Sequence, residues 1–366
     1  MAWRLSDIDD EALWEYNSRG TERIMRVVIG WDVGGAHLKV ARAEDGCIVD
    51  AVQVASPLRL GLERLTQAFV DAKARIGSGD LHVVTMTGEL ADTFTSRAEG
   101  VQALAALAAS ELAPATVSLY AGRAGFVAPE HAHRHWQDIA SANWYATASL
   151  AARGVRTALL VDIGSTTTDL VPIVTGSVAA HGYTDAERLA AGELVYTGMV
   201  RSFAMAVAER APFAGRWSPL INENFATMAD VHRILGQLPD GVDQMATPDG
   251  RAKSIEASRA RLARMIGCDM DDASETAWSM LARWFAEGQI RAIIDGAMLV
   301  LSYGRVPASA PIVGAGIGNI VVREVARRLG RKHVAFDNVI NVAPHARDRA
   351  SHCAPAAALA YLASPS

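Results

Sequence analysis

Two acidic residues, each at the end of an apolar run and each followed by glycine or small hydroxyl residues, are the features of this sequence best suited to chemistry. With their neighbours they are Asp32, Gly34 and Gly35 near the start of the chain and Asp162, Gly164, Ser165 and Thr166 near its middle. Small residues let backbone N–H groups approach phosphate oxygens closely, and two carboxylates can hold a hydrated Mg²⁺ between them. Lys39 would add a positive charge for a phosphate. The pattern predicts a magnesium-assisted polyphosphate site, with Asp32 and Asp162 binding the metal directly or through water.

Each acid is expected at the tip of a strand–hairpin–strand unit, and this unit occurs twice. Apolar, β-rich runs separated by turn residues predict strands at residues 24–32, 37–42 and 48–54, and again on both sides of a hairpin within residues 158–174. When Asp32 is aligned with Asp162, Lys39 falls on Asp169. The chain therefore contains an internal duplication.

A third glycine-rich turn supports the duplication. Residues 311–318 read as a short strand followed by a turn that contains Gly314 and Gly316, and they occupy the place in the second half that residues 83–89 occupy in the first. The predicted organisation is an N-terminal extension (1–23), a first α/β half (24–150) and a second α/β half (151–366) with a helical insertion at about 201–286.

Composition excludes several classes of protein. The chain has 366 residues, is 50% hydrophobic, and carries 35 basic and 40 acidic residues for a net charge of −5. A basic surface for nucleic acid is therefore not expected, and no apolar run reaches the roughly 18 residues that span a membrane. The three cysteines are far apart in the sequence, which predicts neither a disulfide framework nor a zinc site and favours the reducing cytoplasm.

The two acidic hairpins resemble a known pair of phosphate loops. Asp32-Val-Gly34-Gly35 and Asp162-Ile-Gly164-Ser-Thr-Thr are similar to the first and second phosphate loops of the actin, sugar-kinase and Hsp70 ATPase superfamily, and Gly314-Ala-Gly316 is similar to its adenosine loop. The run from Asp162 to Leu170 also resembles the hydantoinase A/oxoprolinase branch. The resemblance implies two RNase H-like halves with five-stranded mixed sheets around a central cleft, and it admits ATP as a ligand that the preferred function does not require.

A narrower resemblance covers nearly the whole chain after about residue 24. Segments 30–39, 86–92, 139–144, 195–198, 225–230 and 247–251 are similar to proteins of tetrahydromethanopterin-linked one-carbon transfer, whose archaeal members are methanofuran-biosynthesis synthases. This resemblance implies a transferase that joins an aminomethylfuran diphosphate to the phenol of a γ-glutamyltyramine or a tyrosine-type acceptor. An ether forms and pyrophosphate leaves. The expected partners are these small molecules, and the oligomeric state is left open, with a homodimer as one option.

The phenol needs a base, and the substrates need binding groups. Glu89, at an expected strand end beside the cleft, is the candidate base, with Asp230 and Asp249 of the insertion as reserves. The candidates for substrate binding are Asn143, Tyr196, Arg201, Asp230, Asp249 and Arg251. Arg201 could hold the γ-glutamyl carboxylate.

Two other functions stay open on the sequence. The loops by themselves favour an ATP-dependent kinase or an oxoprolinase-like amide hydrolase, in which Glu89 would orient the attacking water. The third interpretation is a non-catalytic nucleotide sensor or scaffold with the same fold. Only the narrower resemblance places the transferase ahead of these two.

Overall fold

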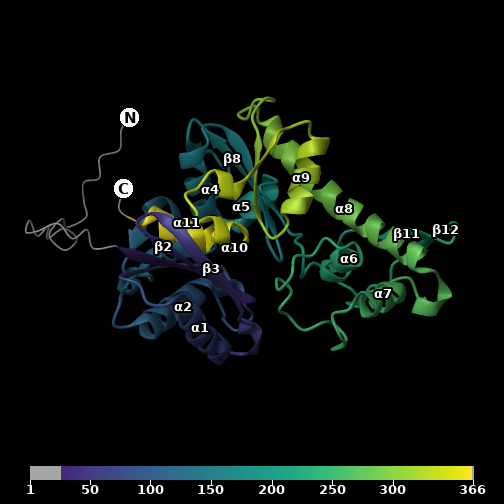
Figure 1. The fold of residues 1–366 in the computed structure, drawn as a ribbon, viewed down its shortest axis with the longest axis horizontal. Helices are drawn as coiled ribbons and strands as arrows, with labels where there is room; N and C mark the ends of the chain where they lie inside the picture. The colour runs from purple at the N-terminus through teal and green to yellow at the C-terminus, as the bar shows by residue number, and fades with distance from the viewer. Residues whose placement is uncertain (1–25, 365–366) are drawn as a thin grey trace, which may run out of the picture.

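The computed structural model describes residues 26–364, and the expected extension at residues 1–23 lies outside them (Figure 1). The first half is a mixed sheet in the order β3-β2-β1-β4-β5-β6. Its strands are β1 (Val27–Val33), β2 (His37–Glu44), β3 (Cys47–Ala55), β4 (Leu81–Met86), β5 (Thr116–Tyr120) and β6 (Phe126–Val127). The first three strands are antiparallel neighbours, whereas β4 and β5 run parallel to β1. The predicted hairpin unit is confirmed.

The second half repeats this plan. Its sheet has the order β10-β8-β7-β13-β14, with β9 paired to β8. The strands are β7 (Ala158–Ile163), β8 (Thr168–Val174), β9 (Ser177–Val178), β10 (Leu194–Val195), β13 (Ile312–Gly316) and β14 (His333–Ala335). Each sheet has six strands in the described part of the chain, one more than the predicted five. The difference comes from two-residue strands at or beside the sheet edges, which are too short to give a sequence pattern.

Helices cover the outer faces of both sheets. In the first half, α1 (Leu62–Ile76) and α2 (Arg97–Leu112) pack on one face, where Trp31 of β1 contacts Phe69 with ring centroids 5.1 Å apart. In the second half, α8 (Glu275–Ser302) and α9 (Asn319–Arg328) bury the corresponding face. None of the helices in residues 26–364 is both long and apolar enough to cross a lipid bilayer.

Two helices lie between the sheets and join the halves. Side chains from β1 and β4, from β7 and β8, and from α4 (Asn143–Gly154) and α11 (Ala354–Leu362) share one hydrophobic core. α11 packs against β1 and β2, and α10 (Arg347–His352) packs against β3. The end of the chain therefore returns to the first half, although the sequence assigned all of residues 151–366 to the second. The sequence of an alanine-rich helix indicates that the helix is buried, but it does not indicate which sheet the helix packs against.

The insertion extends from the second half at the far end of α8 (Figure 1). It contains the hairpin β11 (Arg210–Phe213) and β12 (Arg216–Pro219), together with α6 (Met228–Ile234) and α7 (Ile255–Arg264). The N-terminal part of α8 contributes Trp278 and Phe285 to its core. α8 passes through residue 286 without interruption, so the insertion and the second half share this helix. Two short helices, α3 (Trp136–Ile139) and α5 (Asp185–Ala190), complete the described α-helices, and short 3-10 turns such as Gly88–Leu90 lie in the connections.

The contact between β1 and α11 yields a stability prediction. A Cβ on Gly30 would lie 2.0 Å from the carbonyl oxygen of Ala356 and 2.8 Å from the amide nitrogen of Ala360. Both are backbone atoms, so the helix itself would have to move. We expect Gly30→Ala to lower the free energy of unfolding by about 1–3 kcal/mol, measured by urea denaturation.

The matched control is Gly35→Ala, because a Cβ on Gly35 would meet nothing within 4 Å. This variant should unfold at nearly the same urea concentration as the parent. Equal midpoints for the two variants would contradict the close approach of α11 to β1.

Candidate active site

The two acidic hairpins meet at one cavity. In the first, Asp32 pairs with Lys39 across β1 and β2; in the second, Asp162 pairs with Asp169 across β7 and β8. The tips have the same local geometry, since the Gly34 amide donates to the His37 carbonyl at 3.0 Å and the Gly164 amide donates to the Thr167 carbonyl at 2.9 Å. The predicted alignment of the two units is therefore present in the strand registers.

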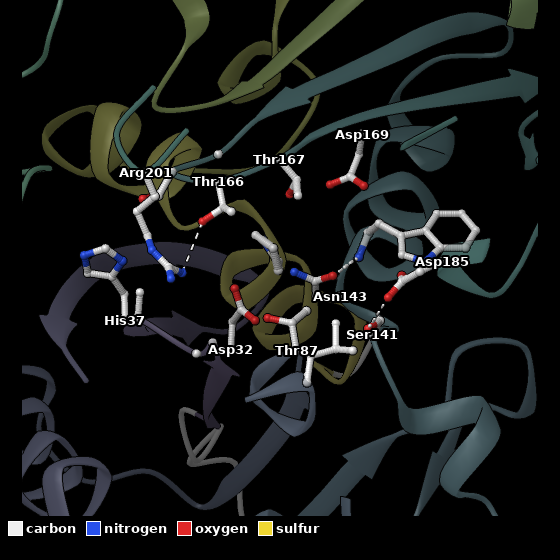
Figure 2. Close-up of a pocket in the computed structure, with 18 of the residues that line it drawn as sticks. Asp32, His37, Thr87, Ser141, Asn143, Thr166, Thr167, Asp169, Asp185 and Arg201 are labelled. Carbon is white, nitrogen blue, oxygen red and sulfur yellow. Dashed lines mark hydrogen bonds between the residues drawn. The ribbon is translucent and has the colours of Figure 1, made fainter. Parts of the chain in front are cut away.

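Both hairpins line a cavity of about 320 Å³. Figure 2 shows Asp32 and Thr87 entering it from the first half, with Thr166, Thr167 and Asp169 on the opposite side. The predicted site residues that line it are Asp32, Gly34, Gly35, Lys39, Asn143, Asp162, Gly164, Ser165, Thr166, Tyr196 and Arg201. Residues from both halves and from the start of α4 therefore form one site.

The two strand-end acids are buried carboxyls. Asp32 is 4% exposed and Asp162 is 7% exposed. Burial raises the pKa of Asp32 to about 6, although Lys39 acts in the opposite direction. Burial, reinforced by the Asp169 carboxylate, raises the pKa of Asp162 to about 7. Oδ1 of Asp32 has no hydrogen-bond partner within the described residues. A divalent cation would supply that partner and favour the ionised carboxylates, so these residues fit Mg²⁺.

Asp169, the counterpart of Lys39 in the second hairpin, forms an ion pair with Arg188. Nη2 of Arg188 donates to its Oδ1 at 2.9 Å, and Arg188 is 1% exposed. The guanidinium of Arg188 also lies over the Trp144 ring, 3.9 Å from the ring centroid. Asp169, Arg188 and Trp144 therefore form a rigid charged wall of the cavity.

Glu89 lies behind the cavity wall rather than in it. It follows β4 and is 1% exposed. Its Oε1 accepts a hydrogen bond from Ser141 Oγ at 2.8 Å, and its Oε2 has no partner in residues 26–364. Burial raises the pKa of Glu89 to about 7, with the Ser141 hydrogen bond opposing. Ser141 itself lines the cavity, so the predicted base reaches it only through this hydroxyl.

The opposite rim is basic. Arg201 extends over the cavity and its Nη1 donates to Thr166 Oγ1 at 3.5 Å (Figure 2). His37 is 5% exposed, and its Nε2 has no partner in the part of the chain that the structure describes. Burial, followed by the charges of Lys39 and Arg201, lowers the pKa of His37 to about 3. His37 is therefore a neutral hydrogen-bonding group at pH 7.

The third glycine-rich turn does not line this cavity. A Cβ on Gly316 would lie 2.4 Å from Asp162 Oδ1, so this glycine, at φ +80°, leaves room for the Asp162 carboxyl group. Gly314 is enclosed in β13 between His333 and Asn319. Gly316 instead borders a second cavity of about 310 Å³, together with Asn319, Arg323 and His352 among others.

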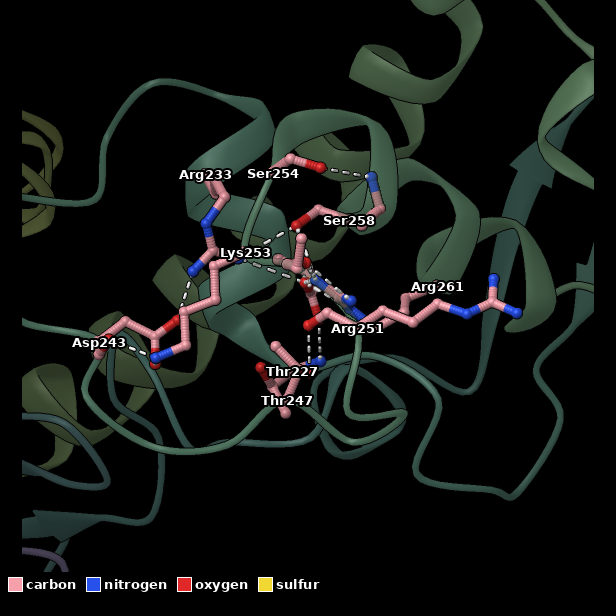
Figure 3. Close-up of polar contacts among 12 residues, drawn as sticks. Thr227, Arg233, Asp243, Thr247, Arg251, Lys253, Ser254, Ser258 and Arg261 are labelled. Atoms are coloured by element: carbon pink, nitrogen blue, oxygen red, sulfur yellow. Dashed lines mark hydrogen bonds and ion pairs between the residues drawn. The ribbon is translucent and has the colours of Figure 1, made fainter.

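Three predicted site residues of the insertion are also placed elsewhere. Asp230 is 1% exposed and accepts from Ser258 Oγ at 2.7 Å and from Arg261 Nε at 2.8 Å. Asp249 accepts from Arg261 Nη1 at 3.0 Å. Figure 3 shows Arg251 in this network, and neither it nor the two acids lines the first cavity. Asp230 and Asp249 are therefore not available as bases: they neutralise a buried arginine and hold the insertion together.

The sequence analysis missed several cavity residues. Ser141 lies between α3 and α4, whereas Asp185 and Arg188 both lie on α5, and no local spacing connects them with the hairpins. Asp169 carried a signal, because it aligns with Lys39 in the duplication. Ser141 lies within segment 139–144, which carries part of the family resemblance, whereas three-dimensional proximity alone brings Asp185 and Arg188 to the site.

Comparison with known proteins defines the family. Residues 80–363 match the hydantoinase/oxoprolinase family. The chain belongs to this family. A protein from Methanocaldococcus jannaschii, named (4-{4-[2-(gamma-L-glutamylamino)ethyl]phenoxymethyl}furan-2-yl)methanamine synthase, is 30% identical over 246 residues, which are 67% of this chain and 73% of that protein. A protein of the same name from Methanococcus vannielii is 34% identical over 116 residues, 32% of this chain and 52% of that protein.

A solved structure agrees with the fold of this hydantoinase/oxoprolinase family member. A nucleotide-free acetone carboxylase superposes with a TM-score of 0.58 at 12% identity, covering 92% of this chain and 70% of that one. This likeness supports the α/β architecture. The names of the sequence relatives indicate an enzyme.

The buried acids generate a pH-dependent stability prediction. A carboxyl whose pKa is higher in the folded than in the unfolded state destabilises the fold once it ionises. For Asp162 the pKa rises from 3.8 to about 7, so the penalty develops as the pH rises from about 4 to 7. In metal-free protein at pH 8, Asp162→Asn should therefore raise the free energy of unfolding by on the order of 2 kcal/mol, with no gain near pH 4.

Glu324→Gln is the contrasting variant. Hydrogen bonds from Arg327 and Arg328 lower the pKa of Glu324 to about 2, so its ionised form stabilises the fold and this variant should unfold at a lower urea concentration than the parent at pH 8. Urea denaturation at several pH values measures both. A destabilised Asp162→Asn protein at pH 8 would contradict the electrostatic description of the site.

Proposed function

We propose that this protein forms a furfuryl aryl ether in the biosynthesis of a methanofuran- or methylofuran-type cofactor. It condenses an aminomethylfuran diphosphate with the phenol of a γ-glutamyltyramine or a tyrosine-type acceptor, and pyrophosphate leaves. The observation that carries the proposal is the meeting of two acidic, glycine-containing hairpins at one cavity, in a chain 30% identical over 246 residues to a synthase whose named product contains a phenoxymethylfuran.

The cavity offers groups for the diphosphate. The side chain of Lys39 faces it, and the amides of Gly35, Ser165 and Thr166 donate to no other backbone group in residues 26–364. As the furfuryl C–O bond breaks, negative charge grows on the departing phosphate oxygens, and donors held in place stabilise that charge without reorganising. Asp32 and Asp162 would hold Mg²⁺, which supplies further charge neutralisation at the diphosphate.

The remaining walls suit the other reactants. The furfuryl carbon becomes electron-poor as the leaving group departs, and the Trp144 ring and the Asp169 carboxylate border the same cavity. The phenol, with an unperturbed pKa of about 10, needs a base, and Glu89 lies next to this cavity behind Ser141. Arg201 and the exposed Tyr196 line the same cavity, and they would bind the γ-glutamyl end of the acceptor.

A second candidate is an ATP-dependent kinase or an oxoprolinase-like amide hydrolase. The cavity beside Gly316 and Asn319 favours it, because a nucleoside there could direct its phosphates toward the hairpins. A nucleotide-binding scaffold without turnover is the third possibility.

The assay that separates these functions measures products. With Mg²⁺, the furan diphosphate and γ-glutamyltyramine, pyrophosphate should appear in step with the ether, detected by mass spectrometry. Omitting either substrate, or chelating the metal, should stop the reaction, and added ATP should remain intact. Asp32→Asn and Asp162→Asn should each lower the rate by at least about 10²-fold, because each removes charge stabilisation from the leaving group.

Asp71→Asn is the matched control, since Asp71 lies on α1 outside the cavity and, within residues 26–364, its side chain accepts from Gln67 alone. It should keep the parent rate. Steady phosphate release from ATP would contradict the transferase in favour of the kinase or hydrolase, and tight ATP binding without turnover would favour the scaffold.

A further inference from the structure

Ser141 is the polar link between Glu89 and the cavity. We propose that Ser141 is a catalytic residue that takes the acceptor's phenolic proton and passes its own proton to Glu89. This inference rests on the ether-forming function proposed above and deepens it. The argument comes from the enclosure of Glu89, the backbone of Ser141 and the charges around the pair.

Glu89 cannot contact a substrate directly. It is 1% exposed and does not line the cavity. On its other side α2 is in close contact, because a Cβ on Gly100 would lie 2.8 Å from both Cα and the carbonyl oxygen of Glu89. Its Oε1 instead accepts from Ser141 Oγ at 2.8 Å. A proton from the cavity therefore reaches this carboxylate through the hydroxyl.

The backbone of Ser141 is held in an unusual conformation. Four non-glycine residues in the described chain have a positive φ, and three of them (Asp45, Thr175 and Ala214) directly precede a glycine in a hairpin turn. Ser141, at φ 53°, lies instead between α3 and α4. A left-handed conformation is unfavourable for a residue with a side chain and concentrates at functional sites. Here it accompanies a hydroxyl that bridges the cavity and a buried acid.

The charges around the pair favour a base that works near neutral pH. Arg97 of α2 and Asp185 of α5 act on Glu89 in opposite directions and form an ion pair with each other. Burial is the largest effect and raises the pKa of Glu89 to about 7, which is close to the value that suits general base catalysis at physiological pH.

Ser141 can accept while it donates. Its Oγ lies 2.8 Å from Glu89 Oε1 and 3.3 Å from Asp185 Oδ2 (Figure 2 shows the second contact). A hydroxyl has one proton to donate and two lone pairs that accept. With Glu89 ionised, the hydroxyl proton of Ser141 is used in the shorter contact, to Glu89. A lone pair of Ser141 Oγ is then available to accept a hydrogen bond from the phenolic O–H of the substrate in the cavity.

The proposed step balances. The phenolic oxygen forms a bond to the furfuryl carbon while that carbon's bond to the phosphate oxygen breaks, and the pair of electrons leaves with pyrophosphate. The phenolic proton moves to Ser141 Oγ, and the hydroxyl proton of Ser141 moves to Glu89 Oε1. After product release, Glu89 returns the proton to solvent by the reverse path through Ser141.

The test combines side-chain removal with acceptor acidity. Ser141→Ala and Ser141→Gly should each lower kcat by about 10²-fold, with little change in KM for the furan diphosphate. The rise of kcat through about pH 7, set by Glu89, should disappear. Fluorination of the acceptor ring makes the phenol more acidic, so the loss of rate should shrink with each fluorine. Glu89→Gln should show the same loss of kcat and of pH dependence. The double variant Ser141→Ala/Glu89→Gln should be no slower than Glu89→Gln.

Thr175→Gly is the matched control. Thr175 also has a left-handed φ, 52°, and a hydroxyl that donates to a backbone carbonyl, but it lies in the β8–β9 turn away from the cavity. It should keep the parent rate and pH profile. A Ser141→Gly enzyme with the parent pH profile would overturn the relay, as would a loss of rate that is equal at every pH and for every phenol. Absence of ether from the wild-type protein would overturn the proposed function and the relay together, whereas ether formation with an unaffected Ser141→Ala enzyme would overturn only the relay.

Discussion

The burial of two carboxyl groups, Asp32 and Asp162, at facing strand ends is the constraint on which the site depends. Both are more than nine-tenths buried, and burial raises the pKa of each. Folding alone does not repay this cost, because one oxygen of Asp32 has no partner in the described residues. The cation and diphosphate of the proposed function would offset it. The surrounding features suit such a ligand: Lys39 opposite Asp32, hairpin-tip amides that donate to no backbone group in residues 26–364, and a glycine at residue 316 where any side chain would meet Asp162.

The distance between the two acids is set by the helices between the sheets. Asp32 belongs to one sheet and Asp162 to the other, so no hydrogen-bonded ladder connects them. α4 and α11 share a core with both sheets, and the close approach at Gly30 fixes α11 on β1. α4 also begins with Asn143 and Trp144 at the cavity. The same helices therefore join the halves and supply part of the site.

The insertion contributes to the site through its connections rather than through its acids. Its buried ion pairs hold α6 and α7 together around Arg261. The loop between α6 and α7 contacts the first half. There, Gln53 Nε2 donates to the Val242 carbonyl at 3.2 Å, and Gln244 Nε2 donates to the Gln53 carbonyl at 3.1 Å. Lys253 is near enough to lower the pKa of His37. A buried ionic network is costly to break. The ion pairs around Arg261 therefore hold this loop in place beside the basic rim of the cavity.

The sequence alone was sufficient for whatever depends on local pattern. Two hairpins with matching acids, the duplicated α/β plan and the resemblance to the hydantoinase/oxoprolinase branch all come from runs of adjacent residues, and the strand registers place Lys39 and Asp169 at equivalent positions. Such patterns are readable because a strand and its turn obey short-range rules of alternation and backbone conformation.

Tertiary structure decided the rest. It placed α11 on the first sheet, Glu89 behind Ser141, and Asp230 among buried cations, while it brought Asp185 and Arg188 to the cavity. The physical reason is that periodicity specifies which face of an element is buried but not which element packs against it. The burial and the hydrogen-bond partners of an acidic side chain are likewise fixed only when distant segments pack around it. Whether a carboxylate serves as a base, a metal ligand or half of an ion pair is determined by those neighbours.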